Sequence, residues 1–253
     1  MAKWLVGGML AVVTVAAWAG VLTHASAPGG DMAQMSPGAW SRLLGTAGFV
    51  GAWVVMMAAM MLPSAAPLVL LYRFAGPGGR AANSVPLVAG YLVMWAVFGA
   101  MVYAGQQGLL ALTGAIPVLV NAGPYAVAAI LAIAGVYQFT SLKKACLREC
   151  RSPLDFLVHH WRGRGVFDAF RLGTDHGAYC VGCCWALMAV LVIAGAMSLL
   201  WVVLIALLVF VEKLVPFGER GAQLSGAGLG GRAVLVAWDS GLSMGLRAVG
   251  EGE

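Results

Sequence analysis

The sequence predicts an all-α fold, a polytopic membrane helical bundle with about six transmembrane helices and a short interfacial helix. Hydrophobic residues make up 61% of the 253 residues, and charged residues only 10%. A soluble domain carries about 25% charged residues, so this chain has too little polar surface to face water on all sides. Its 35 glycines suit closely packed membrane helices. The net charge of +5 comes from short segments between apolar spans, which indicates membrane topology and not a nucleic-acid site.

The first two predicted spans lie in the N-terminal part of the chain. Residues 4–22 form the first, and the outer loop after it completes a segment of residues 1–44. Its apolar stretch is longer than a signal-peptide core of about 7–15 residues, so we expect a retained helix. The second span fills the uncharged stretch between residues 42 and 73. Pro63 and Pro67 lie inside it and predict a kink or a local opening of the helix.

Four further spans are expected in two long uncharged stretches. The first stretch, residues 81–142, is too long for one helix. Glycine, proline and asparagine in its 113–124 segment predict a hairpin between spans three and four. The second stretch, residues 176–211, just fits two spans of about 20 residues each, with a turn at 195–198.

Lysine and arginine predict the orientation of the bundle. With the N-terminus inside, every Lys and Arg except Arg42 lies on the inner side. We therefore expect a multi-pass protein of the inner (cytoplasmic) membrane with both termini in the cytoplasm. Residues 45–220 form the predicted metal-binding membrane domain. Residues 221–253 form a Gly-rich cytoplasmic or interfacial tail, with a weak apolar pattern at 233–238.

A short amphipathic helix is predicted on the inner membrane surface after span four. Ser152 is a suitable N-cap and Pro153 suits the first helical position. An apolar stripe follows at helical spacing, formed by Leu154, Leu157, Val158 and Trp161.

The most specific chemical pattern is a group of cysteines. All five cysteines lie between residues 146 and 184, and Cys180, Cys183 and Cys184 form a C-x-x-C-C motif with His176 just before it. Two thiolates at this spacing can turn onto one soft metal ion, such as copper(I) or zinc. The alternative is that these are small apolar residues packed at the start of a helix.

Cys146 and Cys150 form a second pair on the same predicted side of the membrane. Their spacing of four places them on one helical face. Because the cytoplasm keeps thiols reduced, five thiols at this edge favour metal binding or transient redox use over structural disulfides. Whether the two groups form one site or serve only in packing stays open at this point.

Methionines form the second chemical pattern, in the second span. Met57, Met60 and Met61 lie at spacings of three and four, on overlapping faces of a helix. Thioethers are neutral, soft ligands that select copper(I) and need no deprotonation. The alternative is ordinary packing, because methionine fills gaps between helices.

Two further polar pairs lie in or near the spans. Glu212 and Lys213, near the inner end of the last span, are either functional or paired with each other at the interface. Tyr137 and Gln138 are expected to form hydrogen bonds across helices. The chain carries no phosphate loop, dinucleotide motif or nucleophile–base set, so we do not expect an enzyme.

Five segments together resemble the bacterial family of predicted metal-binding integral membrane proteins, which includes copper chaperones of tyrosinase-type oxidases. They are MMAAMMLPS at 56–64, GVYQ at 135–138, LKKACLRECRSP at 142–153, GAYCVGCCWALM at 177–188 and EK at 212–213. The resemblance covers about residues 45–220. It implies metal binding, with copper as the metal, and an accessory role in loading a partner.

These patterns lead to a copper-handling hypothesis. Copper(I), preferred over zinc, would be held by Cys180, Cys183 and Cys184, with Cys146, Cys150 or His176 as further ligands, and Met57, Met60 and Met61 as weaker sites. The expected partners are the lipid bilayer and a copper-dependent oxidase or another membrane protein complex, with no nucleic acid.

Two alternatives belong to other classes. A membrane thiol oxidoreductase would use Cys180 and Cys183 with a quinone, and would form a reversible disulfide without bound metal. A structural or assembly subunit of a larger membrane complex would pack through the small residues of span three, such as Gly90, Gly99 and Gly105. Such a subunit would co-purify with a partner and tolerate cysteine replacement.

Overall fold

The computed structural model describes eight parts of the chain. They are residues 12, 14–19, 37–75, 84–116, 123–161, 165–195, 199–215 and 218–238, and the side chains of residues 37–44, 75 and 195 are not described. These residues form helices and contain no strand, which confirms the all-α class. Most of the first predicted span, the centres of the two predicted hairpins and the last part of the tail lie outside the described residues.

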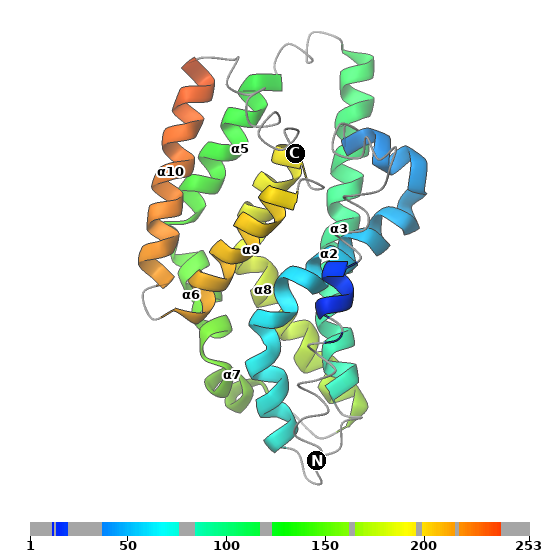
Figure 1. The fold of residues 1–253 in the computed structure, drawn as a ribbon, viewed down its shortest axis with the longest axis vertical. Coiled ribbons are helices and arrows are strands. Elements are labelled where there is room, and N and C mark those ends of the chain that lie inside the picture. The colour runs from blue at the N-terminus through cyan, green and yellow to red at the C-terminus, as the bar shows by residue number, and fades with distance from the viewer. Residues whose placement is uncertain are drawn as a thin grey trace.

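The described helices pack around one central helix, α8 (Figure 1). Helix α8 contacts α3, α5, α6 and α9, and α2 packs against α3 and α9. The helix bounds are α2 Pro37–Ala75, α3 Ser84–Ala115, α5 Gly123–Tyr137, α6 Ser141–Arg151, α7 Pro153–His160, α8 Val166–Gly195, α9 Leu199–Leu214 and α10 Gly218–Trp238. The ends of α3 and α5 bracket the first predicted hairpin, and those of α8 and α9 bracket the second.

Three of the described helices are long and apolar enough to cross a membrane. They are Gly45–Phe74, Ser84–Ala115 and Val166–Ala194. A fourth crossing arises if α5 and α6, which are bent by 63° relative to each other, count as one broken span. The predicted count of about six is therefore not supported. Helix α9 has 16 residues, about 24 Å at 1.5 Å per residue, which falls short of a hydrocarbon core of about 30 Å.

The expected opening of the second span at its prolines is wrong. Helix α2 continues through Pro63 and Pro67, and its non-helical backbone lies at Gly45, with φ 62° and ψ −178°. A positive φ is accessible to glycine without the steric penalty of a Cβ atom, so the chain changes direction there. Ser64 Oγ donates to the carbonyl of Met61 at 2.8 Å, which gives a polar partner to the backbone beside Pro63.

The predicted interfacial helix forms as α7, with Pro153 in its first turn. Only half of the predicted stripe is buried: Leu157 and Trp161 pack into the protein beside Phe156, while Leu154 and Val158 are exposed. Ser152 makes no side-chain capping bond. The exposed Leu154 and Val158 leave an apolar edge available to a membrane surface.

Residues 218–238 of the predicted tail region form α10, which lies beside α5 (Figure 1). The two helices are antiparallel, since Gly226 approaches Gln138 while Gly230 approaches Gly135. A Cβ atom on Gly226 would lie 2.7 Å from Cβ of Gln138, so the glycines permit a close helix approach. The weak apolar pattern of this segment did not indicate that it joins the bundle.

Candidate metal centre

Cys180, Cys183 and Cys184 lie in the middle of α8 and are buried inside the bundle, at 0–1% exposure. Spacings of three and four place Cys183 and Cys184 one turn after Cys180. Their thiols donate to the carbonyl of Cys180, at 3.1 Å for Cys183 and 3.0 Å for Cys184. The three thiols therefore point into protein and not toward lipid.

The second cysteine group meets the first. Cys150 Sγ of α6 lies 3.9 Å from Cys183 Sγ of α8. Cys146 lies over Gly182, where an added Cβ atom would come within 2.8 Å of its sulfur. Helices α6 and α8 thus bring together thiols that are 33 residues apart in sequence. The Tyr137 hydroxyl donates to the carbonyl of Gly182, which confirms the expected bond across helices.

Cys180 faces a different set of partners. Its sulfur lies 2.9 Å from Nζ of Lys213 on α9 and 3.0 Å from the hydroxyl of Tyr91 on α3. Sequence reasoning did not identify either contact, because each joins helices that are far apart along the chain. Tyr91 carries one signal, since a polar group inside an apolar span usually needs a partner on another helix.

The methionine run lies next to this thiol. Met57, Met60 and Met61 are buried in the same core as the three α8 cysteines. Met61 Sδ lies 4.0 Å from Nζ of Lys213, the same atom that contacts Cys180. A thioether and a thiol from separate helices therefore share one cationic neighbour.

His176, the predicted additional ligand, lies one turn before Cys180 and is 4% exposed. Its ring packs against Tyr91 and Phe156, at centroid distances of 5.9 and 5.0 Å. Its Nδ1 has no hydrogen-bond partner among the described residues. His176 therefore lies between α7 and the cysteines: its ring contacts Phe156 of α7 and also Tyr91, whose hydroxyl contacts Cys180.

Glu212 and Lys213 are not paired with each other, which corrects one of the two interpretations of this pair. The carboxylate of Glu212 forms a buried ion pair with Lys143 of α6 at 2.7 Å. Gln138 also accepts a hydrogen bond from Lys143. Adjacent residues on a helix point in different directions, so Lys213 turns to Cys180 instead.

The described residues contain no group of three or more His, Cys, Asp or Glu side chains arranged to hold a metal ion. The sulfurs of Cys150, Cys180 and Cys183 lie close together, and Lys213 and Met61 adjoin the Cys180 side of this group. These soft ligands suit copper(I) better than zinc, because structural zinc sites are closed and have four ligands.

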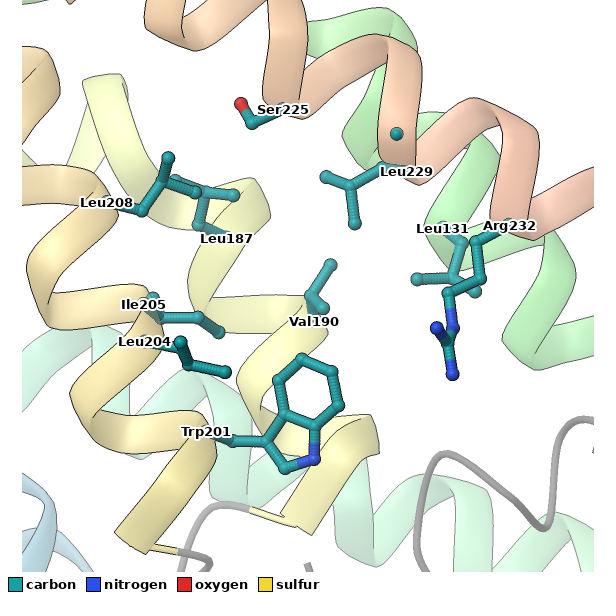
Figure 2. Close-up of a pocket in the computed structure, with 11 residues that line it drawn as sticks. Leu131, Leu187, Val190, Trp201, Leu204, Ile205, Leu208, Ser225, Leu229 and Arg232 are labelled. Atoms are coloured by element: carbon teal, nitrogen blue, oxygen red, sulfur yellow. The ribbon is translucent and has the colours of Figure 1, made fainter. Parts of the chain in front are cut away.

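A separate apolar cavity lies between α5, α8, α9 and α10 (Figure 2). Its volume is about 230 Å³, and its wall includes Leu187, Val190, Trp201 and Ile205. Ser225 and Arg232 are its polar lining residues, and none of the cysteines or methionines lines it. The sulfur cluster is thus a packed site in the core and not part of this cavity.

Comparison with known protein families gives a match. The copper chaperone family PpoB2 matches residues 50–236, a range that includes the methionine run, all five cysteines and most of α10. No curated protein and no solved structure matches the chain. The matched range covers well over half of the sequence, and this chain therefore belongs to the PpoB2 copper chaperone family.

Proposed function

We propose that this protein carries copper(I) as cargo within a membrane helical bundle and delivers it to a copper-dependent oxidase or another membrane protein complex. The observation that carries the proposal is the 3.9 Å contact between Cys150 and Cys183, which joins the two cysteine groups in a buried core. Membership of a copper chaperone family supports copper as the ion, and a non-catalytic role.

The cysteines supply the stronger ligands in this proposal. Thiolates bind copper(I) tightly, and Cys150, Cys180 and Cys183 present sulfurs from two helices. Cys183 and Cys184 donate to the carbonyl of Cys180, so binding requires these thiols to lose their protons and turn from the backbone. Cys146, beside Gly182, supplies a further sulfur at the partly exposed edge of the cluster.

The methionines supply weaker ligands for transfer. Met61 adjoins the Cys180 neighbourhood, and Met57 and Met60 extend the soft surface along α2. A copper(I) ion can exchange between thiolates and thioethers without a change in oxidation state. His176 extends the same path toward α7, where its free Nδ1 is available as a ligand.

The membrane setting is part of the proposal. Three apolar helices support an integral position, and the bias of Lys and Arg supports the inner membrane with residues 143–161 facing the cytoplasm. Cys146 and Cys150 of α6 then lie toward the reducing side, where thiols are available to metal, while Cys180, Cys183 and Cys184 lie deeper, in the middle of α8.

Copper measurement on the purified protein tests the proposal. The variant Cys180→Ser/Cys183→Ser/Cys184→Ser should lose stoichiometric copper(I), because hydroxyls are hard and weak ligands for this ion. Copper is measured by mass spectrometry after loading under reducing conditions, and folding by circular dichroism and gel filtration in detergent. The matched control is Ala178→Ser, which adds a hydroxyl at an exposed position of the same helix. Copper retained in full by the triple variant contradicts the site.

The Cys150–Cys183 contact also favours a second candidate, a thiol oxidoreductase. Two thiols would lose two electrons and two protons to a quinone, giving one disulfide and one quinol. The partner of Cys183 in such a reaction would be Cys150, since the contact joins these two sulfurs, and not the Cys180 expected from sequence. Thiol trapping in intact cells separates the candidates, because only an oxidoreductase cycles through this disulfide in metal-free protein.

A further inference from the structure

Lys213 places a positive charge inside the sulfur cluster. The side chain is 5% exposed, near the end of α9. Its Nζ lies 2.9 Å from Cys180 Sγ, 3.4 Å from Ser64 Oγ and 4.0 Å from Met61 Sδ. These contacts span α8 and α2, so the ammonium lies between the thiol and the thioether that copper would use.

Among the described residues, no carboxylate lies within ion-pair distance of Lys213. The neighbouring Glu212 is bound to Lys143. A buried ammonium without a counter-charge is costly, and the acidic groups that face Lys213 are the thiols of Cys180, Cys183 and Cys150 and the hydroxyl of Tyr91. The sulfur cluster is therefore the natural counter-charge of Lys213.

Because Lys213 lies beside the thiols, its positive charge adds to the total charge of the metal-loaded site. For any fixed set of thiolates, a divalent ion makes the loaded site one unit more positive than a monovalent ion does. The ammonium of Lys213 repels this extra positive charge. In a buried site of low dielectric constant the repulsion is weakly screened, so the ammonium disfavours the divalent ion relative to the monovalent one.

We propose that Lys213 determines ion specificity, making the cysteine cluster favour a monovalent soft cation over a divalent one. This inference rests on the proposed copper(I) function and adds a residue that acts on selectivity through its charge. Ser64 and Met61 contact the ammonium from α2.

Competition measurements with copper(I) and zinc(II) test this inference. Lys213→Met and Lys213→Gln remove the charge with different shapes, and Lys213→Arg keeps it. The ratio of copper(I) to zinc(II) affinity, measured against chromophoric chelators, should fall by about tenfold or more in both neutral variants. It should stay near the wild-type value in Lys213→Arg. Lys144→Met, which removes an exposed charge from α6, is the matched control and should leave the ratio unchanged.

The outcomes separate this inference from the proposed function. Copper(I) binding with an unchanged ratio in the neutral variants overturns the role of Lys213 and leaves copper binding in place. A wild-type protein that binds no copper(I) overturns both. The use of two neutral variants keeps the test decisive, because either one that folds reports the effect of charge.

Discussion

Two buried lysines, 70 residues apart in sequence, make different contacts at the same end of the bundle. Lys143 is neutralised by Glu212, with side-chain exposures of 1% and 2%. Lys213 faces sulfur instead. The two positive charges therefore have separate tasks: Lys143 ties α6 to α9, and Lys213 adjoins the candidate ligands.

Breaking the Lys143–Glu212 pair should destabilise the fold. Lys143→Met leaves the Glu212 carboxylate buried and unpaired, at an expected cost of about 3–5 kcal/mol. The double variant Lys143→Met/Glu212→Met removes both charges and should recover much of this loss. Thermal unfolding in detergent, followed by circular dichroism, measures the difference. A double variant no more stable than the single one would show that the pair is not the cause.

At the same scale, the side chains of the site were only partly predictable. The spacing of Cys180, Cys183 and Cys184 identifies a thiol cluster in an apolar helix, and the structure shows that cluster buried. The contacts of Lys213 depend on how α9 crosses α8 and α2, which a local pattern does not specify. For the same reason, one of the two interpretations of Glu212 paired it with its sequence neighbour Lys213, whereas its partner is Lys143 on α6.

At the scale of helices, glycines determine how closely α3 approaches α8. A Cβ atom on Gly173 would lie 1.9 Å from the carbonyl oxygen of Leu87, and one on Gly90 would lie 2.1 Å from that of Phe170. Gly99 gives room to the ring of Trp53 on α2. Gly105, grouped with Gly90 and Gly99 from sequence, has open space around it. Close packing along α3 therefore uses two of these three glycines.

A comparison of glycine variants measures this helix contact. Gly173→Ala should lower stability by about 1–3 kcal/mol, because the added methyl group meets backbone that cannot move aside easily. Gly105→Ala is the control on α3 and should be neutral or slightly stabilising, since alanine favours the helical state over glycine. The readout is the midpoint of thermal unfolding in detergent. Equal effects of the two substitutions would contradict the close approach of α3 and α8.

Helix positions were more predictable than helix packing. Long uncharged stretches located α2 and α3 and the second half of α8, which begins at Val166, ten residues before its uncharged stretch. The turn residues located the end of α3 and the start of α5. Two physical effects were not visible in the sequence pattern. First, α2 stays helical through Pro63 and Pro67. Second, the glycines of α10 allow it to pack closely against α5.

At the scale of the whole molecule, the direction of α10 indicates at which end of the bundle residue 238 lies. The bundle places Arg232 of α10 beside Leu131 in the middle of α5, and Gly226 beside the end of α5. Trp238 therefore lies toward the end of the bundle where α5 begins (Figure 1). The sequence predicts a C-terminus on the same side as residues 143–161, and α10 is not among the described helices that are long and apolar enough to cross a membrane.

Topology reporters decide between the two orientations. A reporter fused after residue 238 lies on the opposite side of the membrane from one inserted near residue 163 if α10, packed antiparallel to α5, follows that helix across the membrane. It lies on the same side if α10 stays at the surface. Paired fluorescent-protein and alkaline-phosphatase fusions measure the side of each position. Reporters on the same side would support the sequence prediction and contradict a membrane crossing by α10.

X-ray absorption spectroscopy of the copper-loaded protein tests the central claim, that copper(I) is held by sulfur in the core between α6 and α8. The wild-type protein should show a first coordination shell of sulfur atoms. This shell should be lost when Cys180 and Cys183 are both replaced by serine. A shell of nitrogen and oxygen atoms, or a sulfur shell that survives both replacements, would contradict the central claim.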